Sequence, residues 1–250
     1  MVCLFVLAAL AQIGLGKTIG LWKDDRSAIS DGMLKTLQED GWQTVILKGK
    51  DLSDATKLAG LDVLFLPGGW NAYDFADFQA RRAMVKYAAG GRGILAGAFR
   101  SGYARTANRP VFPQVGATYN RVNGPFISAA GDSDLARAID KPFCPGGWDH
   151  LAVQVGPWGK VFAVNGGDPV GVYGEVYGGR YLIFGAFLGV DAVSNAMQGT
   201  ERAVLLSSVN WLAAAPKLDE AEKARQETKA EFDFMRRETL WNWVLNERGP

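Results

Sequence analysis

Apolar runs alternate with segments of helical periodicity along the first hundred residues. Four runs have the length and composition of buried strands, at 17–22, 42–49, 62–70 and 91–98. Three segments between them have a helical pattern, at 31–40, 53–59 and 75–91. This βαβα order with nearly continuous apolar strands predicts a doubly wound, mostly parallel sheet with helices on both faces.

Capping residues mark the ends of these predicted helices. Ser30 or Asp31 can accept hydrogen bonds from the free amides at the start of the first helix, and Gly41 follows its end. Gly90 and Gly91 close the third helix before the next strand. The caps therefore agree with the periodicity about where the helices lie.

The first 16 residues, MVCLFVLAALAQIGLG, form an uncharged apolar segment. It is shorter than the roughly 20 residues of a membrane span, and small residues near Ala11 and Gly16 suit cleavage. We interpret residues 1–16 as a signal peptide and expect the mature protein to be exported, periplasmic or extracellular, with no membrane span. A buried first strand running into Lys17 is the alternative.

The last 35 residues, 216–250, form a separate helical arm. Its first half is polar nearly all round, whereas its second half carries large apolar side chains: Phe232, Phe234, Met235, Leu240, Trp241, Trp243, Val244 and Leu245. So many apolar groups are unfavourable in water. We expect them to be buried against this domain, in a homodimer, or on another protein.

Composition indicates one large domain between these segments. Of 250 residues, 48% are apolar and 11% aromatic, enough for a substantial core. Lys and Arg number 27 against 26 Asp and Glu, a formal net charge of +1. Such a balance gives no positive field for nucleic acid or an anionic membrane surface. If Cys3 is removed with the signal peptide, Cys144 remains alone and no internal disulfide is expected.

Two short motifs suggest chemistry that their surroundings do not support. GLGKT at 14–18 resembles the end of a phosphate-binding loop, but Ala11 stands where that motif needs its first glycine. His150, the one histidine of the sequence, has either a catalytic pairing with Cys144 or a hydrogen-bonded structural role. One histidine and scattered acids do not give the spacing of a zinc site. We therefore predict no cofactor and no metal.

Two glycine-rich turns follow the third and fourth apolar runs, LPGGW at 66–70 and GILAGA at 93–98. In parallel sheets, ligands bind at the carboxyl ends of the strands. The small residues of the second turn favour a sharp strand-to-helix elbow with Leu95 at its tip. The candidate ligand-binding residues at this edge are Gly68, Gly69, Trp70, Asn71, Leu95, Ala96, Arg100 and His150.

Together these turns resemble the class I glutamine amidotransferase-like superfamily, and GRGILAGAF at 91–99 is similar to its biotin-protein-ligase N-terminal-like branch. Segment 168–191 is similar to the part of the family that leads into a His-Pro-Glu sequence. The closing helix at 200–215 resembles the ThuA-like, trehalose-utilisation-like branch. We expect a flavodoxin-like α/β domain over 17–215, with added β-hairpin elements between 115 and 185.

The resemblance also implies a Cys-His-Glu triad, and none of its members is present. Leu95 stands at the cysteine, Phe187 at the histidine and Gly189 at the glutamate. Acyl transfer needs a thiolate, a base and a group that orients the base, and these three side chains supply none of them. The backbone amides around Gly69 and Ala96 could still donate hydrogen bonds to a ligand's oxygen.

Three functional hypotheses remain. The first is a non-catalytic, exported domain that binds a small molecule or sugar-like ligand at the strand ends. The second is a hydrolase that acts on carbohydrate or amide substrates through a replacement site. The third is a scaffold or interaction protein that acts through the C-terminal aromatic helix. Polar side chains converging on Leu95 would favour the first two, and a filled cleft would favour the third.

Overall fold

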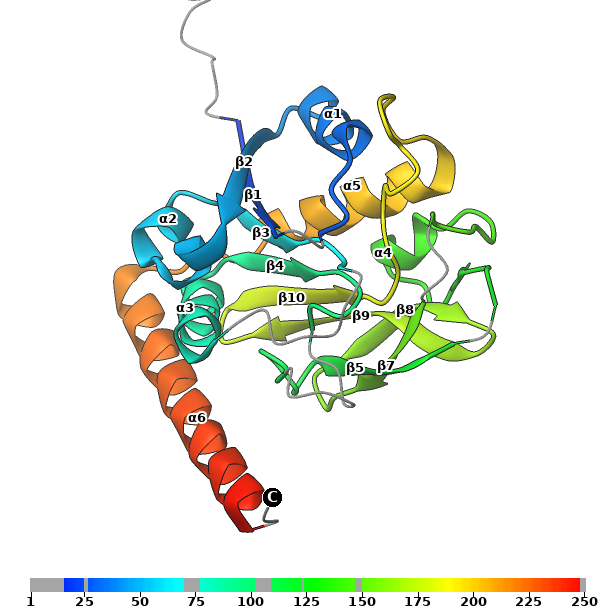
Figure 1. Ribbon diagram of the computed structural model, residues 1–250. Helices are drawn as coiled ribbons and strands as arrows, with labels where there is room; N and C mark the ends of the chain where they lie inside the picture. Colours follow the sequence, from blue (N-terminus) through cyan, green and yellow to red (C-terminus); the bar gives the residue numbers. More distant parts are fainter. Residues whose placement is uncertain are drawn as a thin grey trace, which may run out of the picture.

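The computed structural model describes residues 16–24, 27–69, 77–101, 109–122, 124–146 and 150–247, with side chains to residue 241. Its centre is an eight-stranded sheet in the order β2-β1-β3-β4-β10-β9-β8-β6, beside a two-stranded sheet, β5-β7 (Figure 1). The strands are β1 (Thr18–Lys23), β2 (Gln43–Lys48), β3 (Val63–Leu66), β4 (Gly93–Ala96), β5 (Gly116–Arg121), β6 (Ser128–Ala129), β7 (Leu151–Val155), β8 (Lys160–Asn165), β9 (Asp168–Val176) and β10 (Gly179–Phe184). The helices are α1 (Asp31–Glu39), η1 (a 3-10 helix, Gly49–Ser53), α2 (Ala55–Ala59), α3 (Phe78–Ala89), α4 (Asp134–Arg137), α5 (Gly199–Ala213) and α6 (Glu220–Glu247).

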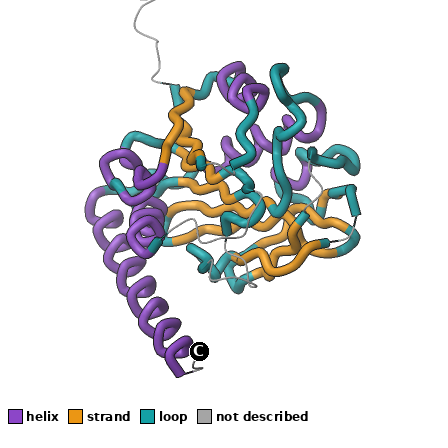
Figure 2. The backbone as a smooth tube through the Cα atoms, in the orientation of Figure 1, coloured by secondary structure: helices purple, strands orange, loops and turns teal. Residues whose placement is uncertain are grey.

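Five neighbouring strands, β2, β1, β3, β4 and β10, run parallel to one another. Their side chains alternate between two cores. Leu95 belongs to the core that includes α1 and α5, whereas Ile94 and Ala96 belong to the core that includes α2, α3 and α6. Figure 2 shows these helices packed around the strands. The prediction of a doubly wound, flavodoxin-like α/β fold is confirmed.

Capping residues define where α1 and α3 begin and where α1 ends. Ser30 Oγ accepts a hydrogen bond from the Met33 amide at 3.1 Å, and Asp77 accepts one from the Ala80 amide at 2.8 Å. Gly41 follows α1 with φ at +87°, a backbone conformation that glycine adopts without steric cost. The first helix is thus bounded as its sequence predicted, and α3 begins at Phe78.

The far half of the main sheet is antiparallel. β9 pairs antiparallel with both β10 and β8, and β6 pairs antiparallel with β8. A two-glycine turn, Gly166 and Gly167, joins β8 to β9, with φ at +59° and +96°. These are the hairpin elements predicted between 115 and 185.

Helix α6 packs antiparallel to α3 and extends beyond the rest of the molecule (Figure 1). The two ends of the contact show the direction, because the Phe234 ring contacts the Phe78 ring while Lys223 lies near Gly90. Among the described residues, no helix is long and apolar enough to cross a membrane.

The expected burial of the aromatic half of the arm is only partly right. Phe234 is 1% exposed, but Phe232 is 66%, Met235 42% and Leu240 58% exposed. The reason is helical geometry, because a single docked face cannot include positions 232, 235 and 240 together with 230, 234 and 238. Side chains beyond Trp241, those of Trp243, Val244 and Leu245 among them, lie outside the description.

Candidate functional site

The turns after β3 and β4 lie against each other at the carboxyl ends of the strands. The Gly97 amide donates to the Leu66 carbonyl at 2.8 Å. A Cβ on Gly97 would lie 2.4 Å from the Gly68 nitrogen, closer than atoms can approach. Gly97 is therefore needed for the close approach of two backbones, as its place in the predicted turn suggested.

The elbow lies four residues beyond the predicted position. Leu95 is inside β4, in register with Phe65 and Leu182, and its side chain is completely buried. The residue with left-handed backbone is Phe99, at φ +66°. The prediction of Leu95 at the tip was wrong because β4 stays paired with both neighbouring strands as far as Ala96.

The amides expected to receive a ligand's oxygen are part of the fold. The Gly69 amide donates to the Ala98 carbonyl at 3.3 Å. Ala96 lies within β4, in register with Leu66 and Ile183. The pairing of β3 with β4 extends into both turns, which corrects the expectation that Gly69 and Ala96 present free donors to a cleft.

Phe187 fills the space over the first turn. Its side chain is completely buried, and its ring would lie 2.8 Å from a Cβ on Gly68. It packs in a small apolar cluster with Ala98, Phe99 and Leu151. The position that the resemblance assigns to a catalytic histidine thus holds a core aromatic ring.

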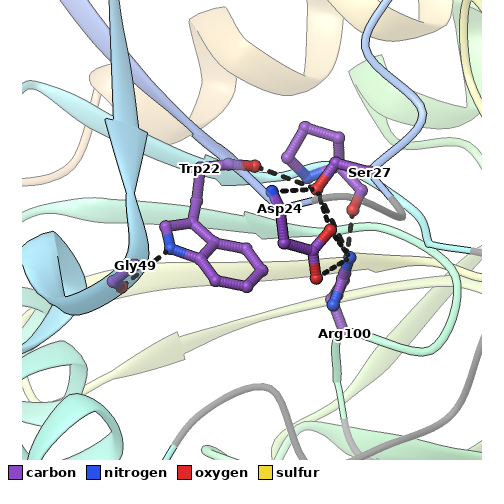
Figure 3. Close-up of polar contacts among 6 residues, drawn as sticks. Trp22, Asp24, Ser27, Gly49 and Arg100 are labelled. Atoms are coloured by element: carbon purple, nitrogen blue, oxygen red, sulfur yellow. Dashed lines mark hydrogen bonds and ion pairs between the residues drawn. The ribbon is translucent and has the colours of Figure 1, made fainter.

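Arg100 also lies against the first turn, where its guanidinium would lie 2.3 Å from a Cβ on Gly69. The Arg100 side chain is 2% exposed and donates to both oxygens of Asp24, at 2.9 and 3.0 Å (Figure 3). Its Nε donates to the Pro67 carbonyl at 3.1 Å, and its guanidinium carbon lies 5.0 Å from the centre of the Trp22 ring. Both hydrogen bonds to Asp24 come from one nitrogen, Nη2, and together with the Pro67 carbonyl and the Trp22 ring they hold the guanidinium in one orientation.

Ser27 completes this polar cluster. Its hydroxyl donates to Asp24 Oδ1 at 2.7 Å and accepts from the Asp24 amide at 3.0 Å. The cluster joins the segments that follow β1, β3 and β4, which are far apart in sequence (Figure 3). Ser27 was not among the predicted site residues, and its Asp-x-x-Ser spacing from Asp24 was the available local signal.

Glu201, a carboxylate that sequence reasoning missed, contacts Gly189. Gly189 has φ +72°, and its amide donates to Glu201 Oε1 at 2.6 Å. Burial raises the pKa of the Glu201 carboxyl, and the nearby Asp191 charge adds to the shift. Glu201 comes from the first turn of α5, so it approaches Gly189, the position that the resemblance aligns with a glutamate, from another element.

His150 has a structural environment. It is 1% exposed, and its Nδ1 lies 2.7 Å from the side-chain nitrogen of Asn165, which also donates to the Gly124 carbonyl. Cys144 is exposed and not in a disulfide. No group of three or more potential metal ligands exists in the described part of the chain. Trp70 and Asn71 lie outside the described residues, so the site brings together Gly68, Gly69 and Arg100 of the predicted set.

Solved structures with very different sequences have the same fold. A cytoplasmic protein from Salmonella typhimurium LT2 matches with a TM-score of 0.57 at 14% identity, over 78% of this chain and 99% of that one. A protein from Bacteroides uniformis ATCC 8492 named as ThuA-like gives 0.52 at 14%, over 79% and 91%. A protein from Thermoplasma acidophilum named as part of a GMP synthase gives 0.52 at 14%, over 80% and 95%.

No protein-family model and no curated protein matches the sequence. At 14% identity, the structural likeness shows the fold alone. At the level of the fold, it agrees with the amidotransferase-like resemblance of the glycine turns and with the ThuA-like resemblance of the closing helix. Chemistry must be argued from the site itself.

Proposed function

We propose that this protein acts by recognition and does not catalyse amide hydrolysis. Its strand-end site is filled by its own side chains, and its recognition surface is the flank formed by α3 and α6, hereafter the α3–α6 flank. The proposal is the third of the sequence hypotheses, made specific by the position of α6.

One observation carries the proposal. Phe187 and Arg100 lie directly against Gly68 and Gly69 of the first glycine turn, Phe187 also packs with Ala98 of the second, and Leu95 points into the core. A nucleophile elbow functions only when its side chain is exposed to substrate and its oxyanion donors are free. Here Leu95 is completely buried, and the Gly69 and Gly97 amides donate to carbonyls of the fold.

The α3–α6 flank, in contrast, has apolar side chains exposed to solvent. Phe232, Met235 and Leu240 are exposed on α6, although burying such side chains stabilises a protein by roughly 1.5–3 kcal/mol each. Exposed apolar groups grouped on one helix are typical of interaction surfaces. The homodimer predicted through this helix is one form that the recognition could take.

A glutamine-hydrolysis assay tests the proposal. The unaltered protein and Leu95→Cys should both release no ammonia above the buffer rate, because a thiol at position 95 would lie inside the core beside Phe65 and Leu182. The triple variant that adds Phe187→His and Gly189→Glu should also be inactive if it folds. Sustained hydrolysis by the unaltered protein would contradict the proposal.

We also propose that the protein is exported, on the basis of the apolar segment 1–16. N-terminal sequencing of secreted material should give a start between Gln12 and Thr18. Recovery of intact Met1 from the cytoplasmic fraction would show that the segment is retained. A small-molecule or sugar-like ligand at the strand ends, with Trp70 and Asn71 among its candidate residues, stays a prediction.

A further inference from the structure

A groove of about 440 Å³ lies on the α3–α6 flank, between α2, α3 and α6. Small-molecule sites have volumes of roughly 300–1,000 Å³. The groove is separate from the strand-end site. It lies beside Gly90, at the end of α3, and therefore near the amino end of β4, whereas the strand-end site is at the carboxyl end. Its walls come from helices at positions 53–59, 79–90 and 223–227, and Arg92 adds a side chain from the segment that leads into β4.

The groove contains an apolar part. Leu58 is 2% exposed and Tyr87 8% exposed, and Ala59 and Ala83 add small side chains beside them. The Tyr87 hydroxyl donates to the Leu61 carbonyl at 3.3 Å, so its hydrogen bond is satisfied within the fold. The small alanines leave the volume that larger residues would occupy. This part suits an aliphatic or aromatic body.

The groove also carries four cations, Arg82, Lys86, Arg92 and Lys223. Glu231 forms ion pairs with two of them, at 2.6 Å from Arg82 and 3.5 Å from Lys86. Arg92 pairs with Asp62 at 3.0 Å. Counting Glu227, which also lines the groove, four cations face three carboxylates, an excess of one positive charge.

We assign the excess positive charge to Lys223. It is four residues before Glu227 on the same helix, yet within the described residues neither side chain forms an ion pair within 4 Å. Arg82, Lys86 and Arg92 are 39–46% exposed, so their charged groups stay at the edge of the groove in contact with water. An anion placed there would keep part of its hydration.

We propose that this groove binds a small monoanionic amphiphile, a carboxylate or sulfonate attached to an apolar body. The inference deepens the proposed function and rests on it, since it takes the α3–α6 flank as the recognition surface. The apolar body lies against Leu58, Ala83 and Tyr87, and the anionic group lies toward Lys223. For a ligand of about twenty non-hydrogen atoms, the expected dissociation constant is on the order of 10⁻⁵ M.

Fluorescence titration with anilinonaphthalene sulfonate, with displacement by decanoate, tests this assignment on the full chain. Saturable binding is expected, with decanoate displacing the probe and decanol, of equal chain length but uncharged, displacing it at least about tenfold less well. Lys223→Glu should weaken binding about tenfold. The matched control is Lys229→Glu, the same charge change on the exposed side of the same helix, which should leave binding unchanged.

Ala83→Leu fills the groove without changing its charge and should abolish displaceable binding while the melting temperature is retained. The assignment is overturned if Ala83→Leu binds normally, if decanol competes as well as decanoate, or if Lys229→Glu has the effect of Lys223→Glu. Normal binding by Ala83→Leu would place the probe on Phe232 and Met235 instead. That outcome would leave the proposed function standing, whereas glutamine hydrolysis would contradict that function whatever the probe does.

Discussion

The carboxyl ends of the strands and the α3–α6 flank are each held by a buried arginine paired with a carboxylate, and they differ in what surrounds the pair. At the strand ends, Arg100, paired with Asp24, lies against Gly69 and Phe187 lies against Gly68, so close that a Cβ fits at neither glycine. On the flank, Arg81 pairs with Glu238, while neighbouring side chains leave a groove and an exposed apolar surface. The strand ends, where ligands bind in many parallel sheets, and the open surface can therefore lie in different places within one fold.

The largest expected effect is on the flank. Glu238 accepts from Arg81 at 2.9 Å and from Arg109 at 2.8 Å, with 4–5% exposure in the Arg81 pair. Glu238→Ala removes a buried carboxylate from two cations and should lower the free energy of unfolding by about 3–5 kcal/mol. Urea denaturation measures the loss. The exposed Glu220→Ala on the same helix serves as control, and a loss below about 1 kcal/mol for Glu238→Ala would mean that α6 is not docked through this pair.

The corresponding change at the strand ends should cost less. Asp24 is 27% exposed, so Asp24→Ala should destabilise by about 1–3 kcal/mol through loss of the acceptor for Arg100 and Ser27. Glutaminase activity should stay absent, because no free nucleophile appears. Thermal unfolding compared with the exposed Asp132→Ala gives the difference. Equal stability of the two variants would show that the Asp24 cluster does not hold the turns together.

Alkaline pH should lower the stability of the protein, in part through Tyr177, whose hydroxyl donates to Asp233 of α6 at 3.1 Å. Burial, with the charge of Asp233, raises the pKa of Tyr177 to about 12. In the unfolded chain the hydroxyl ionises near pH 10, so between pH 10 and 12 only the unfolded state gains from ionisation and stability falls. The contribution of Tyr177 is about 1–2 kcal/mol. Tyr177→Phe should therefore lose stability less steeply over this range, and parallel pH profiles would contradict the assignment.

The smallest expected effect concerns Glu201, which lies in the first turn of α5 and contacts the Gly189 amide. Burial raises the pKa of its carboxyl, so its contribution to stability is full at acid pH and declines as the pH rises toward neutral. Glu201→Gln keeps an acceptor for the Gly189 amide and removes the buried charge. The variant should show a flatter stability profile between pH 4 and 7. A steeper profile would mean that the Glu201 charge stabilises the native state.

Local pattern was enough to predict the parallel strands, the caps of α1 and the antiparallel additions, because each depends on short-range periodicity or turn residues. It was not enough for the site. Leu95 was placed at the elbow because small residues surround it, whereas pairing with two other strands decides where β4 ends. Arg100 meets Asp24 across 76 residues, and Glu201 meets Gly189 from a different element. Such contacts depend on tertiary packing, which one sequence does not reveal.

The central claim is that the strand-end site is filled by the protein's own side chains. Native-state amide hydrogen exchange at Gly69 and Gly97 tests it most directly, because these amides belong to the two glycine turns, which a reactive site would need to expose to solvent. Both donate within the fold, to Ala98 and Leu66 respectively. If the strand-end site is filled, both amides should exchange slowly, with protection approaching that of β4. Exchange as fast as that of an unstructured peptide would show that the turns open to solvent, and would contradict the account.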